Sequence, residues 1–256
     1  MPFRPIQSDK LSTAVVRQIE ELILRGILRP GERLPSERDL SERLAVSRPS
    51  LRDALSELQD VGLLEARAGS GVFVAEVLGS SFSPALQDLM SRHDEAVDDY
   101  LAFRRDMEGL AAERAARLGS DTDLKVIQTL FDKMRDAHRG QDADKEGSLD
   151  AQFHMAIVEA GHNVVMLHMM RSMYELLQKG VFYNRTIIFS DASARTALLD
   201  QHAAINDGLQ ARDGAAARKA IEAHLDYVKA MLADQRKAAR NEDLAKLRLD
   251  HEAGQA

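Results

Sequence analysis

The sequence predicts a mainly α-helical protein, in which an N-terminal winged helix-turn-helix is followed by an all-α antiparallel helical bundle. Three observations support this fold class. Residues 34–74 carry the pattern of two short helices joined by a turn and followed by a hairpin. From Ala85 onward, apolar residues recur at spacings of three and four in several successive segments separated by short breakers. Between these regions, residues 76–84 (EVLGSSFSP) are rich in serine and lack periodicity, which is typical of a linker.

These patterns set the expected domain boundaries. At 256 residues the chain is long enough for roughly two domains. We expect a winged helix-turn-helix domain over residues 1–76, a linker over 77–84 and a helical domain over 85–240. The tail, residues 241–256, is polar, and we expect it to be frayed or disordered.

The N-terminal domain should begin with an amphipathic helix from about Lys10 to Arg25, which ends at Gly26. The apolar stripe of this helix consists of Leu11, Val15, Val16, Ile19, Leu22 and Ile23. After a turn at residues 29–32 (RPGE), Ser36 can cap the next helix. Asp39, three residues further on, makes a capping-box-like pair with it.

A second helix follows a short apolar turn at residues 45–46. Ser47 should cap this helix, and Pro49 lies in its first turn, where a missing N–H has no cost. Its buried stripe consists of Leu51, Ala54, Leu55 and Leu58. Arg48, Ser50 and Arg52 lie on the opposite face near its N-terminus, which is where a helix-turn-helix contacts base edges and phosphates.

The hairpin and the local charge both favour DNA binding. Residues 63–67 and 72–74 flank a tip at residues 68–71 (AGSG), and a hairpin directly after a recognition helix is the wing of a winged helix. Residues 1–75 hold 11 Lys+Arg and 11 Asp+Glu, so the domain is neutral overall. However, Arg43, Arg48 and Arg52 form a run with no acid between Glu42 and Asp53, and phosphate contact requires such a patch. We therefore prefer DNA binding to a merely solvated helix face.

Composition excludes several other classes. The chain has no cysteine, which excludes disulfides, thiolate nucleophiles and cysteine-ligated zinc. No apolar run approaches the ~20 residues of a membrane span, and the first residues lack the apolar core of a secretory signal. We expect a cytoplasmic protein with no membrane partner.

The helical domain should contain helices over residues 100–118, 121–138, 142–160, 164–188, 192–212 and 215–240. Asp150 and His154 are four residues apart, so they share one helix face. His202 and His224 lie 11 residues before and 11 residues after Asp213, in the turn between two later helices. If these helices are antiparallel, the two imidazoles lie at one level of the bundle. One carboxylate and three imidazoles could thus meet, a donor set that suits Zn, Ni, Fe or Mn rather than Ca or Mg. Partly exposed histidines on polar faces are the alternative.

Arg104 and Glu108 form a second feature of this domain. A pair four residues apart on a solvated helix face contributes only a few tenths of a kcal/mol. Apolar neighbours at residues 103, 107, 110 and 111 suggest that part of this face turns inward. A buried arginine could then bind the carboxylate of a small ligand bidentately. Periodicity does not decide between the two interpretations.

The chain resembles the GntR superfamily of bacterial transcription factors, in the FadR/FCD subgroup. The DNA-binding match covers residues 11–74, with LRPGERLPSERDLSERLAVSRPSLRDAL as its core. The effector-domain match runs from about residue 100 to residue 231 and includes FRRDMEGLAAERAA, EAGHNVV, the Asp150/His154 pair, His202 and His224. Within the subgroup the sequence is most similar to repressors of the pyruvate dehydrogenase complex, with SFSP at 81–84 and EAGHNVVMLHMMR at 159–171 in common.

This resemblance implies roles for particular residues. The DNA-reading positions correspond to Arg38, Ser47, Arg48, Ser50 and Arg52, with Gly69 at the wing tip. The metal ligands correspond to Asp150, His154, His202 and His224, which implies a divalent metal, Zn or Ni. Effectors of the family are mostly small carboxylates bound at or beside that metal, and the expected effector-binding residues are Arg104 and Asn163.

The implied function is that of a homodimeric DNA-binding repressor of central carbon or organic-acid metabolism. A small carboxylate such as pyruvate would release it from a double-stranded palindromic operator, with half-sites close to TGGT and ACCA. Lactate, glycolate or a sugar acid are alternative effectors, and a sensor of the metal itself is another alternative. An enzyme is a further alternative, because a metal bound by Asp and His can activate water. The sequence offers no general base at an obvious catalytic spacing, so we expect no enzymatic activity.

Overall fold

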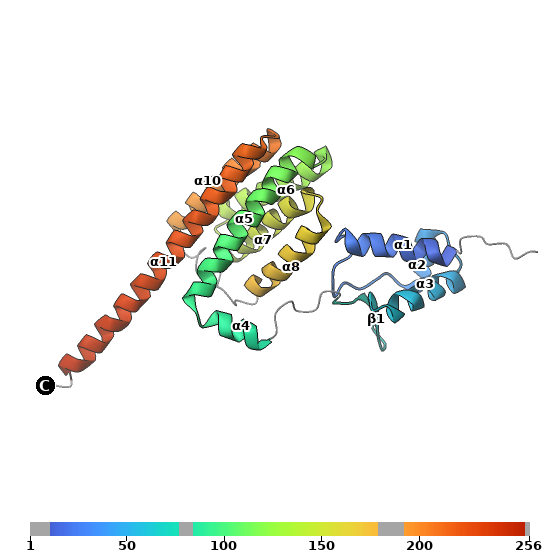
Figure 1. Ribbon diagram of the computed structural model, residues 1–256, viewed down its shortest axis with the longest axis horizontal. Coiled ribbons are helices and arrows are strands. Elements are labelled where there is room, and N and C mark those ends of the chain that lie inside the picture. The colour runs from blue at the N-terminus through green and yellow to red at the C-terminus, as the bar shows by residue number, and fades with distance from the viewer. Residues whose placement is uncertain (1–10, 77–83, 179–191, 254–256) are drawn as a thin grey trace, which may run out of the picture. The chain divides into compact units, whose positions relative to one another are not determined.

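The computed structural model describes residues 11–76, 84–178 and 192–253. The chain divides into two compact units, residues 1–81 and 82–256, and the division falls within the predicted linker (Figure 1). Among the described residues, no helix is both long and apolar enough to cross a membrane.

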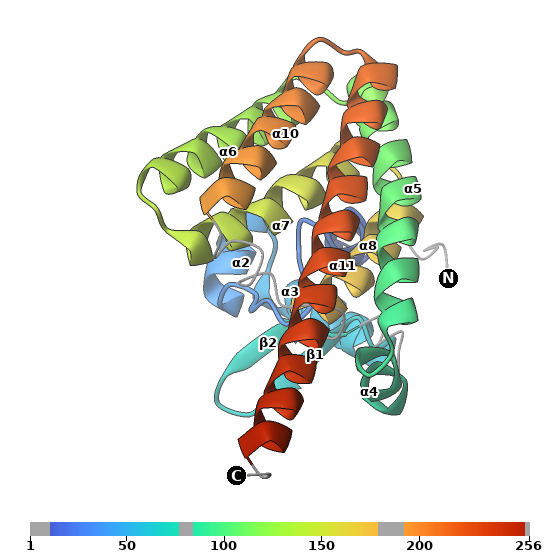
Figure 2. The same ribbon diagram turned by 90° about the vertical axis from the view of Figure 1, so that its left-hand side faces the viewer.

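The N-terminal unit is a winged helix-turn-helix, as predicted. Its helices are α1 (Leu11–Leu24), α2 (Glu37–Leu44) and α3 (Arg48–Asp60), and α3 packs against both of the others. Strands β1 (Leu64–Arg67) and β2 (Gly71–Val74) form the antiparallel wing, with Leu64 opposite Val74 (Figure 2). A single bridge from Arg33 to Phe73 adds a further backbone segment beside β2.

Local sequence signals account for these elements. The Ser36 hydroxyl accepts a hydrogen bond from the Asp39 N–H at 3.2 Å, and the Ser47 hydroxyl accepts one from the Ser50 N–H at 3.3 Å. Ala45 ends α2 in the left-handed conformation, with φ of 52°. The core of the unit contains the whole predicted stripe of α3 and four residues of the predicted α1 stripe: Val15, Val16, Ile19, Ile23, Leu51, Ala54, Leu55 and Leu58. The other two α1 residues differ from the prediction, because Leu11 at the start of the helix is exposed and Leu22 is only half-buried.

The second unit is an antiparallel bundle of helices. Its described helices are α4 (Pro84–Ser91), α5 (Asp94–Leu118), α6 (Asp121–Arg139), α7 (Ala143–Ala160), α8 (Val164–Gln178), α10 (Ala192–Gln210) and α11 (Gly214–Ala253). Helix α11 packs along α5 and α10, and α7 packs along α5 and α6 (Figure 2). A Cβ at Gly208 would lie only 2.8 Å from the backbone nitrogen of Ala217, so α10 and α11 approach this closely because residue 208 is glycine.

Several boundaries differ from the sequence-based expectations. Helix α4 begins at Pro84, which we had placed in the linker, and α5 begins six residues before Tyr100. The predicted helix over 164–188 is described only to Gln178, and its remainder lies outside the described residues.

The polar segment after residue 240 is the largest difference. We expected a frayed or disordered tail, but α11 continues through it to Ala253 with its side chains exposed. The segment is rich in Ala, Leu, Lys, Arg and Glu, which are strong helix formers, and it extends a helix already nucleated in the bundle. An ion pair between Lys246 and Glu242, four residues apart, adds local support at 3.8 Å.

Candidate functional site

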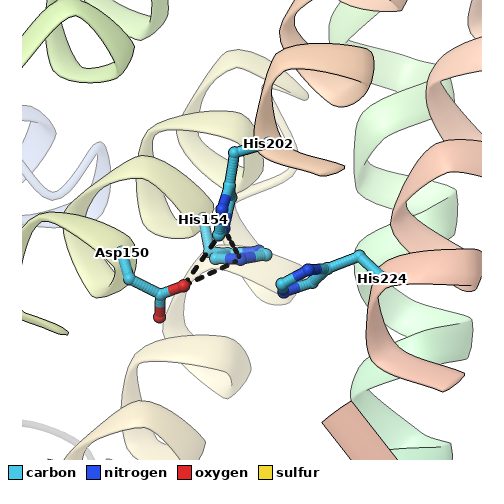
Figure 3. A group of neighbouring side chains, drawn as sticks. All are labelled: Asp150, His154, His202 and His224. Atoms are coloured by element: carbon cyan, nitrogen blue, oxygen red, sulfur yellow. Dashed lines mark hydrogen bonds and ion pairs between the residues drawn. The ribbon is translucent and has the colours of Figure 1, made fainter. Parts of the chain in front are cut away.

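The four predicted metal ligands meet inside the bundle. Asp150 and His154 come from α7, His202 from α10 and His224 from α11 (Figure 3). All four are buried, and one ligand atom from each lies within 4.8 Å of the others. The turn at residues 211–213 folds α11 back along α10, which places His202 and His224 at the same level, as their equal spacing from Asp213 predicted.

The nitrogen and oxygen atoms of the cluster face one another at short distances. Nε2 of His154 lies 3.2 Å from Nε2 of His202. Asp150 Oδ1 lies 3.1 Å from His202 Nε2 and 3.6 Å from His154 Nε2 (Figure 3). The ring of His224 lies beside both other imidazoles, with its centroid 4.5 Å from that of His202 and 5.1 Å from that of His154.

Each imidazole has an oxygen atom beside its other nitrogen, Nδ1. His202 Nδ1 lies 2.7 Å from the Leu198 carbonyl oxygen, and His224 Nδ1 lies 2.9 Å from Oε1 of Gln201. His154 Nδ1 lies 2.7 Å from Oε2 of Glu108. These acceptors favour a proton on Nδ1, which leaves the Nε2 lone pairs for the centre of the cluster.

This arrangement fits a bound divalent metal ion. Lone pairs that converge in a buried site repel one another, and a cation between them removes that repulsion. In a tetrahedral site with bonds of about 2.0–2.1 Å, ligand atoms are separated by about 3.3 Å, close to the separations among Asp150, His154 and His202. The donor set of imidazole and carboxylate suits a transition metal.

The electrostatics of the site favour the neutral, metal-binding form of His202 and His224. Burial, followed by the neighbouring imidazoles, lowers the pKa of His224 well below its ordinary value. Burial also lowers the pKa of His202, and Asp150 only partly opposes it. Burial acts in the same direction on His154, but the Glu108 and Asp150 carboxylates outweigh it, and the pKa of His154 is raised.

Arg104 lies inside the bundle beside this cluster. Its side chain is only 2% exposed, so the inward orientation that periodicity could not decide is the observed one. Arg104 Nε donates to Glu108 Oε1 at 2.6 Å, and its Nη2 donates to the Tyr174 hydroxyl at 2.8 Å. Since Glu108 also contacts His154, Arg104 is connected to the candidate metal ligands through one carboxylate. Effector binding by Arg104 stays a prediction.

Asn163 has a structural role at the start of α8. Its side-chain oxygen accepts hydrogen bonds from the backbone N–H groups of Val165 and Met166, both at 3.1 Å. It therefore caps the helix. Its predicted contact with an effector remains a prediction.

The predicted DNA-reading residues lie on the helix-turn-helix and the wing. Arg38 and Arg48 are exposed, and Gly69, with φ of +71°, lies at the wing tip. The hydroxyls of Ser47 and Ser50 are hydrogen-bonded to each other at 2.9 Å, so both take part in the cap of α3. Arg52 Nε donates to Glu37 at 2.8 Å, which ties its guanidinium to the first turn of α2.

Sequence reasoning missed the residues that surround the candidate metal ligands. Glu108 was considered only as a partner of Arg104, and neither Gln201 nor Tyr174 was singled out. Their roles depend on which helix faces meet, and the spacing of single residues carries no signal of that.

The winged helix-turn-helix and the helical bundle with its buried Asp/His cluster together define a two-domain DNA-binding regulator. Comparisons with known proteins identify its family. Residues 11–74 match the bacterial regulatory proteins of the gntR family, and residues 99–227 match the FCD domain. The chain belongs to the GntR family and carries an FCD domain. It is a transcription regulator and not an enzyme.

Curated relatives cover most of the chain. A protein of Escherichia coli K12 named for the regulation of the L-lactate dehydrogenase operon is 34% identical over 86% of this chain and 85% of its own length. The Glc operon transcriptional activator of the same strain is 32% identical over 86% of this chain and 88% of its own length. The solved structure of a Streptococcus agalactiae GntR protein shares the fold, with a TM-score of 0.51 and 24% identity over 85% of this chain and 98% of that one.

Proposed function

We propose that this protein is a homodimeric repressor that leaves a palindromic operator when a small carboxylate enters the bundle, with pyruvate as the leading candidate. The observation that carries this proposal is that four buried side chains meet in the bundle: Asp150, His154, His202 and His224. Arg104 lies nearby, because the Glu108 carboxylate contacts both Arg104 and His154. A divalent ion and Arg104 would together make this buried region positively charged, which suits a small anion that must be captured away from water.

The ion in this proposal is Zn or Ni, held by Asp150, His154, His202 and His224. When bound, it supplies a concentrated positive charge that attracts a carboxylate. The chain contributes a second positive charge, the Arg104 guanidinium, whose planar fork matches carboxylate geometry. A ligand shifts a regulator only by its differential affinity for the two states, and typical coupling of about 1–3 kcal/mol would reduce operator affinity about 5- to 150-fold.

Lactate is a second candidate effector, and a specific observation favours it. The 34% identical relative is named for the L-lactate dehydrogenase operon. Pyruvate is favoured instead by the resemblance over residues 81–84 and 159–171. Both acids carry one carboxylate beside an oxygen-bearing carbon, so the site chemistry accommodates either.

The test is a titration of pyruvate, lactate and glycolate into a labelled operator complex at saturating Zn²⁺. We expect at least one acid to release wild-type protein. Arg104→Lys should blunt that release, because lysine keeps the charge that balances Glu108 but lacks the planar fork. Arg105→Lys is the matched control, because Arg105 is the adjacent residue and pairs with Asp226 on the surface at 2.9 Å.

Two results would redirect the proposal. If no acid releases the operator at millimolar concentration, the small-acid response is wrong. If, in addition, removal of the metal alone changes operator affinity, the protein is a sensor of the ion itself.

A further inference from the structure

Glu108 is a buried carboxylate that contacts both Arg104 and a candidate metal ligand. Its side chain is 1% exposed. Oε1 accepts hydrogen bonds from Arg104 Nε at 2.6 Å and from the Tyr174 hydroxyl at 2.9 Å. Oε2 lies 2.7 Å from His154 Nδ1. The carboxylate therefore spans α5, α7 and α8 at the edge of the histidine cluster.

The contact between Glu108 and His154 is short but does not have the geometry of a regular hydrogen bond. Neither Glu108 Oε2 nor His154 Nδ1 has a regular hydrogen bond to any other group in the described part of the chain. A carboxylate this close still favours a proton on Nδ1 electrostatically. That proton leaves Nε2 as the only nitrogen of His154 with a lone pair for an ion.

His154 differs in this respect from the other two imidazoles. The oxygens beside Nδ1 of His202 and His224 are a backbone carbonyl and a side-chain amide, and both are neutral. Only His154 has a carboxylate there, and a charged partner makes an imidazole a more basic ligand than a neutral partner does. A buried carboxylate also needs a positive partner, and Arg104 supplies it.

We propose that Glu108 is the positioning residue of the metal site: it fixes the ligand form of His154, and Arg104 and Tyr174 hold it in place. This inference rests on the proposed metal binding by Asp150 and the three histidines. It gives Arg104 a role in the absence of effector, which is to hold Glu108 against His154. An incoming carboxylate that pairs with Arg104 competes with Glu108 for the guanidinium, so metal and effector affinities are linked through this one side chain.

The experiment measures Zn²⁺ affinity by competition with a chelator. Loss of an outer partner of a metal ligand typically weakens metal affinity about 10- to 100-fold, and we expect this range for Glu108→Gln. Tyr174→Phe should weaken affinity in the same direction but less, because Arg104 still holds Glu108. His202→Ala serves as the reference for loss of a direct ligand.

Glu146→Gln is the matched control. Glu146 is also a buried glutamate of this bundle, 4% exposed and paired with Arg195 at 2.6 Å, one helical turn before Asp150. It should leave Zn²⁺ affinity within about threefold of wild type, a change of less than 1 kcal/mol. An equal loss in Glu146→Gln would overturn the inference, because the effect would then be a general loss of bundle stability.

A second measurement does not depend on the folding of Glu108→Gln. Nitrogen-15 NMR of the histidine rings in Zn²⁺-loaded wild-type protein should show His154 protonated at Nδ1. Protonation at Nε2 would overturn the inference, as would wild-type affinity in Glu108→Gln. The two proposals fail differently. If wild-type protein binds no Zn²⁺, both the metal site and the role of Glu108 are wrong. If wild-type protein and Glu108→Gln bind Zn²⁺ equally tightly, only the role of Glu108 is wrong.

Discussion

Neighbouring residues of the same type have opposite environments in this bundle. Arg104 is 2% exposed and pairs with Glu108, whereas the side chain of Arg105 is 36% exposed and pairs with Asp226. The sequence alone could not show which arginine is buried, because an arginine and a glutamate four residues apart, such as Arg104 and Glu108, are equally compatible with a pair on the helix surface. The histidine cluster was predictable, because the equal spacing of His202 and His224 about one turn constrains both at once.

The arginines of the recognition helix give a prediction at this scale. Arg48→Ala should reduce specific operator binding more than nonspecific DNA binding, because a bidentate base contact is worth roughly 1–3 kcal/mol of discrimination. Arg48 is exposed in the first turn of α3, where base edges are read. Affinities for operator and for random duplex, each measured by fluorescence anisotropy at several salt concentrations, provide the check.

Arg52→Ala is the comparison variant. Because Glu37 holds the Arg52 guanidinium, we expect a fixed phosphate contact, whose loss weakens all sequences alike and flattens the salt dependence. Equal losses of specific and nonspecific binding in Arg48→Ala would remove Arg48 from base reading.

At the scale of the elements, helices with a side-chain cap or a buried apolar stripe were predictable, and segments that lack both features were missed. Ser36 and Ser47 begin α2 and α3 as their side chains indicate. Helix α5 begins at Asp94, earlier than predicted, because its first turn is acidic rather than apolar and acids there interact favourably with the helix dipole. The end of α11 was missed because an exposed helix has no buried stripe. Apolar periodicity therefore detects helices that pack an apolar face against a core, and it does not detect exposed helices.

The capping box of α6 gives a prediction about pH. Asp123 accepts hydrogen bonds from the Ser120 N–H at 2.8 Å and from the Ser120 hydroxyl at 2.7 Å. Burial acts to raise the pKa of Asp123, but these bonds and His162, whose Nε2 lies 3.0 Å from Asp123 Oδ2, outweigh it, so the pKa is lowered from its ordinary value of 3.8. A lowered folded-state pKa means that the ionised carboxylate stabilises the fold above pH 3.8 and that this stability is lost as the pH falls through the lower value.

Asp123→Asn should therefore reduce the free energy of unfolding by about 1 kcal/mol at pH 7, the size typical of a helix cap. The difference from wild type should shrink below pH 4. Urea denaturation followed by circular dichroism between pH 3 and pH 7 measures it. Asp121→Asn is the control in the same turn, because Asp121 is 99% exposed and its surface ion pair with Arg212, at 2.6 Å, should contribute less than the capping box. A difference for Asp123→Asn that stays constant down to pH 3 would contradict the assignment.

At the scale of the whole molecule, charge is divided between the two units. Residues 1–75 are neutral, and the rest of the chain carries the formal charge of −7. General attraction to DNA is therefore weak, and affinity must come from the local arginine patch. One winged helix reads only a few base pairs, so a single copy of this chain has little contact from which to build operator affinity.

Two copies on a symmetric operator would solve this problem, and dimeric binding is our prediction at this scale. A linked second half-site typically raises affinity about 10²- to 10⁴-fold without any new kind of contact. We expect an operator with two inverted half-sites to bind at least 100-fold more tightly than the same DNA with one half-site scrambled. Footprinting should show two symmetric protected regions, and sedimentation of the complex should give two protomers per duplex.

The spacing between half-sites provides the decisive control for dimeric binding. Insertion of half a helical turn, about 5 base pairs, places the half-sites on opposite faces of the DNA and should abolish the gain in affinity. A gain that survives this insertion would mean that the two half-sites are not read by one symmetric dimer of fixed geometry, and the absence of any gain, or a complex with one protomer on an asymmetric footprint, would mean that the chain binds its operator as independent monomers.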